Sequence, residues 1–520
     1  MNKLFFGDNL AVLRDYVAPE SVDLIYLDPP FNSNVDFNVL YETPENMRET
    51  AQRSAFEDTW RWEDDAQDTY MDLVARGGRI GPLIEGLRQS LGRSGLAAYV
   101  MMMAIRIVML HKVLRPTGSL YLHCDPTASH YIKLLLDALF EPQNFRSEIV
   151  WRRSSSHNKL TRQYGPIHDT IFFYAKGTNA TFHPGVTPHN RSYIGKAFRH
   201  EDEDGLYRQN EITGSGVRTG DSGAPWRGYD PTEKGRHWAI PKSLRHLLPA
   251  DGKGMKTWEM LDALNEAGVI LISPSGRPTY KQRLSRGVPY QDIWAYQPGT
   301  EGVLVGNDHC IDQDVKWLDA DSERIGYPTQ KPLGLLNRII NTSSNPGDVI
   351  LDPFCGCGTT VESAQRLGRQ WVGIDVSYYS VRLIERRMKS RFGGDYAVPI
   401  DGIPADYAGA EGLAQRDKYG FEQWVVGELG CQLWNAGKKG ADGGIDGEMR
   451  FYGGPDRIGK LLVQVKGGRR STPAQVREFR AVMDSNKADM GIFFCLGETT
   501  VEMRREAADA RTFTLGSTSV

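Results

Sequence analysis

Residues 22–33, VDLIYLDPPFNS, place an acid, two prolines and an aromatic ring directly after an apolar run. The apolar part has the length and composition typical of a buried strand. Proline fixes φ and donates no backbone hydrogen bond, so Pro29 and Pro30 make a stiff, extended exit from a sheet. The sequence therefore predicts that Asp28 and Phe31 are held rigidly at the carboxyl edge of a sheet. A fixed carboxylate can accept hydrogen bonds from a bound group, and a fixed ring can stack on one.

A glycine-punctuated turn in residues 347–360, GDVILDPFCGCGTT, is a second candidate site. Its glycines let the backbone approach a ligand closely and lead directly into a predicted helix. The next predicted strand ends in Asp375, where a carboxylate can accept hydrogen bonds from two ribose hydroxyls. The turn lacks the Gly-x-Gly-x-x-Gly fingerprint and the Lys-Ser/Thr of a phosphate loop, which argues against NAD and ATP. The candidate ligand contacts are Asp352, Phe354, Gly356, Gly358 and Thr359.

Cys355 and Cys357 lie inside the same turn. Two thiols without a second pair are weak support for a metal site. We expect them to be small residues that fill a tight loop.

A third candidate site lies near residue 450. Asp446 belongs to one predicted strand, and Gln464 and Lys466 lie two positions apart on the next. Sites of this kind hold Mg²⁺ with an acid and a strand carbonyl, while a lysine stabilises the attacking water or the phosphate. Glu422, on the preceding predicted helix, is a further candidate ligand. A charged edge hairpin would give the same short pattern.

The elements that must position these residues follow an α/β pattern. Predicted strands alternate with helices up to residue 151 and again from residue 326, which implies a parallel sheet flanked by helices. Residues 42–95 are acidic and are expected to form an inserted helical excursion. Residues 396–417 are rich in Gly, Ala, Pro and Asp and are predicted to be a linker. The 520 residues suffice for two to four domains.

The composition favours a cytoplasmic globular protein. Hydrophobic residues make up 40% of the chain and charged residues 24%. The six cysteines are scattered apart from one close pair, so we expect reduced thiols and no disulfide framework. The N-terminus has no long apolar core of a signal peptide. The apolar stretch 96–110 is interrupted by Arg106 and is too short for a membrane span, so no membrane association is expected.

Residues 152–325 mix Gly, Pro, aromatic and basic residues without clear periodicity, as expected of a surface that recognises a ligand. Residues 151–200 hold eight Lys or Arg against one acid. Such a segment is either a solvated basic face or a phosphate-binding patch. Four aromatic residues of the range 152–325 are expected to belong to the local core rather than to stack on bases: Trp226, Trp238, Trp294 and Tyr296.

Several motifs in a fixed order carry a resemblance to a known family. DPFCGCGTT resembles the S-adenosylmethionine loop of DNA amino-methyltransferases, and DPPF resembles their catalytic motif. YPTQKPLGLLNRII, residues 327–340, is similar to the helix motif that precedes the cofactor loop in the β-class of that family. The resemblance covers about residues 1–395. It implies a Rossmann-like, S-adenosylmethionine-dependent methyltransferase with permuted halves.

The permuted order implies a domain plan. It consists of a catalytic half (1–151), a target-recognition region (152–325), a cofactor half (326–395), the linker (396–417) and a small α/β module (418–520). KLFFGD would be the third strand of the sheet, with Asp8 near the adenine of the cofactor. Lys331 would join the cofactor contacts. The implied partner is double-stranded DNA, bound by a monomer or a homodimer.

The resemblance also implies a mechanism. Asp28 and the carbonyl of Pro29 would accept the two N–H groups of an exocyclic amine and favour its attack on the methyl sulfonium. Phe31 would stack on a base swung out of the duplex. Enzymes that methylate adenine N6 usually carry Asp first in this motif and cytosine N4 enzymes more often Ser, so adenine N6 is expected and cytosine N4 is the alternative.

The last module resembles the Mrr-like branch of restriction-endonuclease folds, in which Gln replaces the usual Glu. The chain ends soon after TTVEMRREAADA, and we expect a shortened domain. The leading hypothesis is a DNA methyltransferase of a restriction-modification or defence system fused to a nuclease domain. One alternative is a Mg²⁺-dependent nuclease effector whose methylase half only recognises DNA, and another is a DNA-binding protein that has lost both activities.

Overall fold

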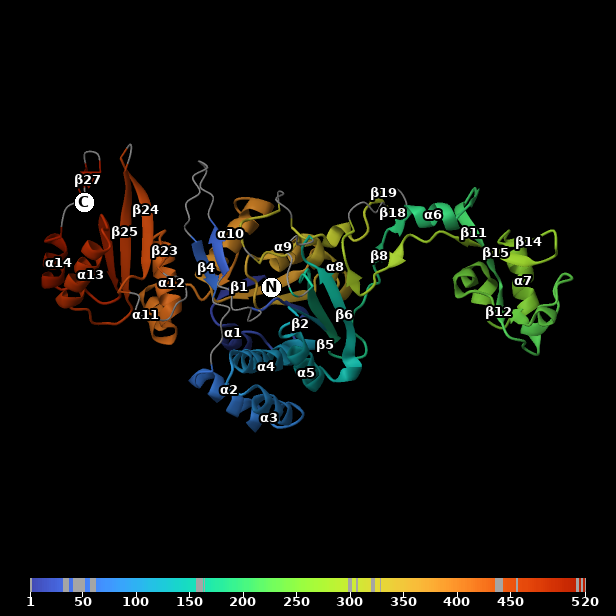
Figure 1. The fold of residues 1–520 in the computed structure, drawn as a ribbon, viewed down its shortest axis with the longest axis horizontal. Coiled ribbons are helices and arrows are strands. Elements are labelled where there is room, and N and C mark those ends of the chain that lie inside the picture. Colours follow the sequence, from blue (N-terminus) through green and yellow to red (C-terminus); the bar gives the residue numbers. More distant parts are fainter. Residues whose placement is uncertain are drawn as a thin grey trace. The chain divides into compact units, whose positions relative to one another are not determined.

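The computed structural model describes most of the chain in two compact units. The described residues are 2–30, 37–40, 52–56, 62–155, 162, 164–297, 302–304, 307–318, 323–327, 329–434, 443–454, 457–510, 514–515 and 518–519. The first unit contains Met1–Pro184, Gln291–Tyr296 and Asp314–Val520. The second contains Gly185–Tyr290 and Gln297–Gln313. Figure 1 shows the elements of both.

A nine-stranded sheet forms the centre of the first unit. Its order is β17 (Ile293–Trp294), β6 (Phe145–Arg152), β7 (His168–Ala175), β5 (Leu114–Cys124), β2 (Val22–Leu27), β20 (Val349–Asp352), β21 (Gln370–Asp375), β1 (Lys3–Phe6) and β22 (Ile400–Asp401). Only β7 runs antiparallel to its neighbours in this sheet. The N-terminal strand β1 pairs with β21, and β2 pairs with β20. The two halves therefore interleave in one sheet, as the permuted order predicts.

Alternate residues of the strands face opposite helical layers. Leu24 and Tyr26 of β2 belong to one buried cluster, whereas Ile25 and Leu27 belong to another. This period of two is what a strand covered on both faces requires. The first cluster includes α8 (Leu333–Ser343), α9 (Thr359–Arg366) and α10 (Tyr378–Phe392). The second includes α1 (Asn9–Asp15), α4 (Gly95–Val113) and α5 (Ser129–Phe140).

Helix α4 is the core helix of the second layer. It contains the apolar stretch noted in the sequence, and it is long and apolar enough to cross a membrane by length and composition alone. Of its most apolar window, 72% is buried inside the protein, as in the core helix of a globular domain. The described part of residues 42–95 holds β4 (Gln52–Phe56), α2 (Asp64–Ala75) and α3 (Ile80–Leu91); β4 pairs with β3 (Phe37–Leu40).

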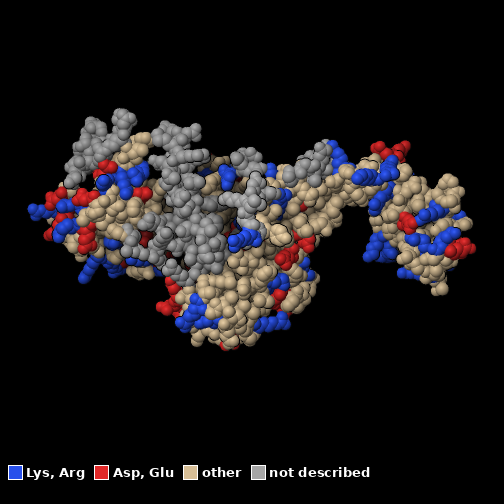
Figure 2. All heavy atoms as spheres, viewed as in Figure 1, with Lys and Arg blue, Asp and Glu red and all other residues tan. Residues whose placement is uncertain are grey.

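The second unit has its own small core. A four-stranded sheet has the order β10 (His200–Asp202), β11 (Gly205–Glu211), β15 (Pro278–Arg283) and β14 (Ile270–Ile272), and α7 (Thr257–Glu266) contributes to the core beside it. Trp226 and Trp238 are buried in this core and do not form an exposed stacking surface. Lys and Arg are interspersed with acids on the visible face of the unit (Figure 2). Its other elements are β8 (Val186–Thr187), β9 (His189–Asn190), α6 (Arg191–Ala197), β12 (Thr213–Ser215), β13 (Arg236–Trp238), β16 (Val288–Pro289), β18 (Gly302–Leu304) and β19 (Asn307–His309).

Some of the range expected to recognise the target belongs to the main sheet. Strand β7 follows residue 152 and completes the sheet, and Trp294 is buried in the edge strand β17. Tyr296 packs its ring against Trp317 with centroids 5.5 Å apart. The compact second unit therefore begins at Gly185 rather than at residue 152.

The C-terminal module is a four-stranded sheet with helices. The order is β23 (Gln432–Leu433), β24 (Gly447–Gly454), β25 (Arg457–Lys466) and β26 (Met490–Cys495). Its helices are α11 (Tyr407–Arg416), α12 (Lys418–Glu428), α13 (Pro473–Ser485) and α14 (Val501–Ala508), and a last hairpin joins β27 (Thr514–Leu515) to β28 (Thr518–Ser519). Helix α11 lies within the range expected to be a linker. It buries Ala410 and Leu413, and its Glu411 pairs with Arg469.

Candidate functional site

Asp28 lies immediately after β2, at the carboxyl edge of the central sheet. One carboxylate oxygen, Oδ2, forms an ion pair with the ammonium of Lys331. The other, Oδ1, is buried and has no hydrogen-bond partner among the described residues. Pro29 is buried and fixes the chain beyond the acid. A buried carboxylate oxygen without a donor is costly, so this atom is suited to a donor on a bound substrate. Phe31, expected to stack on a base, lies outside the described residues.

Lys331 precedes α8 and is separated from Asp28 by 303 positions in the sequence. Its ammonium also donates to the carbonyl of Thr329 at 3.3 Å. The sequence predicted a cofactor contact for this lysine, which stays a prediction, and the structure pairs its ammonium with the carboxylate of Asp28. Lys331 thus holds one oxygen of Asp28, and the other has no hydrogen-bond partner among the described residues.

The glycine turn between β20 and α9 is closed by two carboxylates. Asp375 accepts hydrogen bonds from the backbone N–H of Gly356 and of Ser377, both at 2.8 Å. Asp352 accepts from the backbone N–H of Phe354 at 3.0 Å. Each of these acids follows or ends a strand at the same edge of the sheet as Asp28. The predicted cofactor residues are thus brought together around one turn.

Gly356 and Gly358 adopt the positive φ that the turn requires, at 49° and 78°. At Gly358 a Cβ atom would meet Cγ1 of Ile384 at 2.7 Å, so close packing as well as backbone conformation demands glycine there. Thr359 begins α9 directly after this glycine and is buried. The glycine turn therefore leads directly into the N-terminus of α9.

Burial raises the pKa values of the two acids at this turn. Desolvation raises the pKa of Asp352 to about 7 and the pKa of Asp375 to about 6, although hydrogen bonds to each carboxylate oppose the shift. Acids with raised pKa values at the same edge of a sheet as a further carboxylate, here that of Asp28, are typical of a ligand site. Their ionisation would be favoured by hydroxyl donors from a bound ribose.

Arg387 supports the turn from α10, and sequence reasoning missed it. Its guanidinium forms an ion pair with Glu362 and donates to the carbonyl of Cys357 at 3.1 Å and to Oγ1 of Thr359 at 3.2 Å. Burial raises the pKa of the Cys355 and Cys357 thiols, which keeps them protonated. Both thiols are buried, and among the described residues no group of three or more His, Cys, Asp or Glu could hold a metal.

Asp8 follows β1, the neighbour of β21, and caps helix α1. Its carboxylate accepts from the backbone N–H groups of Leu10 and Ala11 at 3.0 and 3.2 Å, and it pairs with Arg106 at 2.7 Å. Phe6 of β1 lies opposite Asp375 in the register. Asp8 and the turn therefore share one edge of the sheet, where the sequence predicted a cofactor contact.

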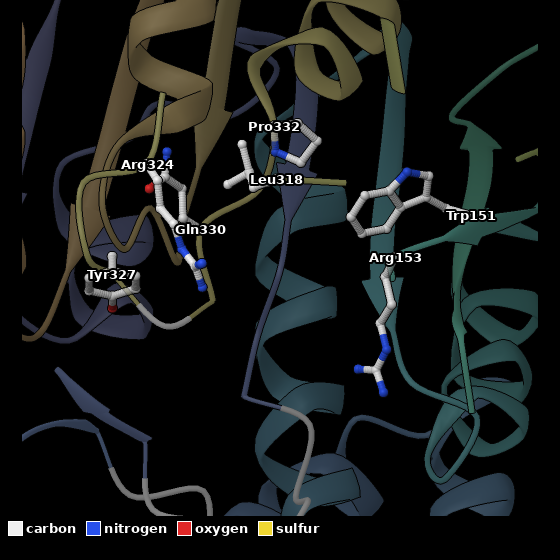
Figure 3. Close-up of a pocket in the computed structure, with 7 residues that line it drawn as sticks. All are labelled: Trp151, Arg153, Leu318, Arg324, Tyr327, Gln330 and Pro332. Carbon is white, nitrogen blue, oxygen red and sulfur yellow. The ribbon is translucent and has the colours of Figure 1, made fainter. Parts of the chain in front are cut away.

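A pocket and a polar group near Asp28 were not found from the sequence. The pocket is lined by Trp151, Arg153, Leu318, Arg324, Tyr327, Gln330 and Pro332. Figure 3 shows Trp151 and Arg153 on one side and Arg324, Tyr327 and Gln330 on the other. The indole of Trp151, which lines the pocket, contacts the buried imidazole of His123, which lies between Asp169 and Tyr26. The only sequence signal was LHCD at the end of a predicted strand.

The C-terminal candidate residues meet across β24 and β25. Asp446 precedes β24, and its carboxylate accepts from the backbone N–H of Val465 at 2.6 Å, between Gln464 and Lys466. Gln464 is buried and donates to the carbonyl of Gly444 at 2.7 Å, while its Oε1 has no hydrogen-bond partner among the described residues. An acid beside an unpartnered amide oxygen fits a hard cation such as Mg²⁺. Glu422 lies on α12.

The comparison with family models agrees with this geometry. A model of the N6/N4 DNA methylases matches residues 22–386, and a model of an Mrr-type restriction endonuclease matches residues 413–517. The chain belongs to the N6/N4 DNA methylase family. This confirms the resemblance that the motifs indicated and the fold class that it implied. The methylase carries an Mrr endonuclease domain after its methyltransferase domain.

The curated relatives include methyltransferases and a subunit of a restriction-modification enzyme. The type II methyltransferase M.EcaI of Enterobacter cloacae is 27% identical over 392 residues, which are 74% of this chain and 69% of the relative. The DNA adenine methyltransferase YhdJ of Escherichia coli K12 is 23% identical over 391 residues, 74% of this chain and 82% of that protein. The StyLTI Mod subunit, a type III restriction-modification enzyme of Salmonella typhimurium, is 24% identical over 379 residues, 71% of this chain and half the length of that subunit.

Solved structures with the same kind of fold are distant. The M1.HpyAVI–SAM complex is 14% identical with a TM-score of 0.30, covering 74% of this chain and all of that one. The PvuII DNA methyltransferase, a cytosine-N4-specific enzyme, is 14% identical with a TM-score of 0.32, covering 74% of this chain and 86% of that one. The site and the family match, not these distant structures, carry the functional argument.

Proposed function

We propose that this methylase transfers a methyl group from S-adenosylmethionine to the N6 atom of adenine in double-stranded DNA. The observation that carries the proposal is the state of Asp28. One of its oxygens is paired with Lys331, and the other is a buried acceptor with no partner among the described residues. A preorganised acceptor of this kind is what an exocyclic amino group needs as it becomes tetrahedral.

The cofactor residues fit S-adenosylmethionine by their chemistry. Asp375 offers a carboxylate for the ribose hydroxyls, and the positive-φ glycines give the ligand access to the backbone. When bound, S-adenosylmethionine supplies an electrophilic methyl group on a sulfonium, so no metal is needed for this transfer. The protein then has to orient an amine, accept its hydrogen bonds and exclude water.

Asp28 and the carbonyl of Pro29 perform the first two tasks. Asp28 Oδ1 accepts one N–H of the adenine amino group, and the Pro29 carbonyl accepts the other. The amine lone pair is thereby directed away from the ring and towards the methyl group. Asp at the first position of the motif supports adenine, as does the name of the relative YhdJ. Cytosine N4 is the alternative substrate.

The Mrr endonuclease domain supports a second activity. We propose that Asp446 and the Gln464 amide oxygen hold Mg²⁺ and that Lys466 faces the phosphate, within a cytoplasmic restriction-modification or defence system. The acceptor Oε1 of Gln464, which is buried without a hydrogen-bond partner among the described residues, supports this assignment. Bound Mg²⁺ would activate water and offset charge on the phosphate.

Mass spectrometry of digested DNA tests the first proposal. Plasmid DNA from a methylation-deficient host is incubated with the full chain and S-adenosylmethionine, with Asp28→Ala as the control. We expect N6-methyladenine with the wild type and none with the variant. N4-methylcytosine alone would replace the adenine assignment with the cytosine one. Absence of any methylated base would overturn methyl transfer and leave DNA recognition as the role of this half.

A further inference from the structure

A buried histidine lies next to the catalytic carboxylate and has no role in the mechanism described above. The side chain of His123, on β5, is fully buried. In the register of β2 and β5, Leu27 lies opposite Leu122, so Asp28 and His123 follow as neighbours on adjacent strands. Nδ1 of the imidazole lies 4.0 Å from Oδ1 of Asp28, the oxygen that Lys331 does not hold.

Two further side chains fix the imidazole. The hydroxyl of Tyr26 lies 3.0 Å from Nδ1, and Oδ2 of Asp169 lies 3.0 Å from Nε2. Tyr26 comes from β2 and Asp169 from β7, so the polar group crosses three adjacent strands. The indole of Trp151 packs edge-on against the imidazole with centroids 5.5 Å apart and covers it.

The surroundings of Tyr26 and Asp169 determine which atoms of this polar group carry protons. Burial, and then the charges of Asp28, Asp352 and Asp169, raises the pKa of Tyr26 well above its usual value, so its hydroxyl stays protonated. Burial also acts to raise the pKa of Asp169, but the hydrogen bond from His123 and the charges of Lys331 and Arg153 outweigh it and lower that pKa. Tyr26 therefore donates to Nδ1, and Nε2–H donates to an ionised Asp169. This tautomer leaves Nδ1 as the basic atom, on the side of Asp28.

Arg153 extends the group to the pocket. Its guanidinium pairs with Oδ1 of Asp169 at 3.2 Å, a charge contact without good hydrogen-bond geometry. The same arginine lines the pocket beside Trp151 (Figure 3). A continuous line of polar groups thus runs from the catalytic acid, through a buried imidazole, to a residue that lines the pocket.

We propose that Tyr26, His123 and Asp169 form a relay that removes the proton released by methyl transfer. The proposal rests on the proposed function. As the new N6–carbon bond forms, the carbon–sulfur bond breaks and the sulfur keeps its electron pair. The amino nitrogen then bears a positive charge and must lose one proton. This proton passes to Oδ1 of Asp28 and from there to Nδ1 of His123, whose lone pair becomes free when the Tyr26 hydroxyl rotates its hydrogen away. This leaves an imidazolium facing the carboxylates of Asp28 and Asp169.

The relay residues act through Asp28 and are positioning residues. A site closed by a bound base excludes bulk water, so an internal acceptor shortens the route of the proton. Two carboxylates stabilise the imidazolium in a buried site, where charge interactions are strong. A structural role alone would require only the hydrogen bond to Asp169, and would not require the basic nitrogen to face the catalytic acid.

Single-turnover methyl transfer tests the relay in the full chain. His123→Gln keeps polar atoms near both neighbours but cannot take up a proton. We expect the transfer rate to fall about 100-fold, a size typical of a lost acid–base group, with the Kd values for S-adenosylmethionine and DNA within twofold of wild type. His130→Gln, at an exposed position on α5, is the matched control and should keep the wild-type rate. A wild-type rate in His123→Gln overturns the relay.

A second arm needs no activity. Imidazole ¹⁵N spectra of the protein without cofactor or DNA report the tautomer of His123. We expect Nε2–H in the wild type, a shifted Nδ1 resonance in Asp28→Asn and a shifted Nε2 resonance in Asp169→Asn. An Nδ1 chemical shift that is the same in Asp28→Asn as in the wild type overturns the relay, even if His123→Gln does not fold. If the wild type transfers no methyl group, this arm still tests the relay, so the two proposals fail separately.

Discussion

At the scale of single residues, the partners of Asp28 and Asp375 determine which carboxylate oxygens are available at the carboxyl edge of the central sheet. Lys331 occupies one oxygen of Asp28, and the other is left as an acceptor in a buried place. Each oxygen of Asp375 accepts a hydrogen bond from a backbone N–H group, and these two bonds close the glycine turn. In the proposed function, Asp28 accepts from the substrate amine, and Asp375 both closes the turn and accepts from the ribose hydroxyls. Substitutions at these two acids should fail in different ways.

Asp28→Ala should abolish methyl transfer and keep cofactor binding. Loss of one preorganised acceptor costs about 3 kcal/mol or more in barrier, which is a rate fall of at least 100-fold. Asp28 lies outside the glycine turn, so the Kd for S-adenosylmethionine should change little. Radiolabelled transfer and calorimetry measure the two effects separately. Near wild-type turnover in this variant would rule out Asp28 as the catalytic acid.

Asp375→Ala should weaken S-adenosylmethionine binding. The variant removes a charged acceptor for the ribose and two bonds that hold the turn, so we expect a loss of about 1.5–3 kcal/mol in binding free energy. Calorimetry at pH 8, above the pKa of about 6 of this acid, measures it with the wild-type carboxylate ionised. An unchanged affinity would mean that the ribose is bound elsewhere.

Asp352 should make the unliganded protein less stable as the pH rises. Burial raises its pKa to about 7, so the folded state prefers the neutral acid, and this stability is lost between the usual pKa near 4 and pH 7 to 8. Each pKa unit corresponds to about 1.4 kcal/mol, which sets an upper limit of about 4 kcal/mol for the loss. Urea unfolding at pH 5 and pH 8 measures the part of this loss above pH 5, at most about 3 kcal/mol. Asp352→Asn removes this ionisation, and an equal loss in that variant would show that Asp352 is not its source.

At the scale of elements, the turn between β20 and α9 positions the cofactor residues. The glycine pattern and the strand-helix alternation identified this turn from the sequence, because a tight turn restricts its residue types locally. The contact of Lys331 with Asp28 was not predicted, because it joins segments 303 positions apart. His123 and Arg387 were missed for the same reason: their partners lie on other strands and helices. Sequence patterns thus predicted the local elements, whereas the contacts of Lys331, His123 and Arg387 became visible only in the folded structure.

Gly358→Ala should disrupt the turn more than its backbone conformation alone explains. Gly358 and Gly368 both have positive φ, at 78° and 70°. A Cβ at Gly358 would meet Ile384 at 2.7 Å, whereas one at Gly368 would meet nothing within 4 Å. We expect Gly358→Ala to cost about 1–3 kcal/mol more in unfolding free energy than Gly368→Ala, with weaker cofactor binding. Equal costs in urea unfolding would show that the contact with Ile384 is easily relieved.

At the scale of the whole molecule, the chain holds two sites that use opposite strategies on DNA. In the proposed function, the methyltransferase site accepts hydrogen bonds from a base and relies on a sulfonium for reactivity. The endonuclease site presents an acid, an amide oxygen and a lysine, which suit a metal and a phosphate. Because the residues of each site belong to separate sheets, a substitution in one should leave the chemistry of the other intact.

Asp446→Ala should abolish DNA cleavage in Mg²⁺ while methyl transfer continues. Asp446 would hold the metal, and Lys466→Ala should also remove cleavage because its charge offsets the phosphate. Lys460→Ala is the matched control: it lies on the same strand, pairs with Glu448 and packs over the ring of Trp434. Gln464→Glu adds a carboxylate, so this variant should cleave at lower Mg²⁺ concentration than the wild type.

The assay incubates the full chain with unmethylated and methylated plasmid, first in Mg²⁺ and then in Mn²⁺. Fusion to a methylase suggests a division of labour, in which one half marks host DNA and the other attacks DNA with the wrong mark. A preference for one plasmid would identify that mark. If the wild type cuts neither plasmid with either metal, or if Asp446→Ala cuts as well as the wild type, the cleavage proposal is wrong. Methylation by the same samples, measured in parallel, shows whether each variant is folded.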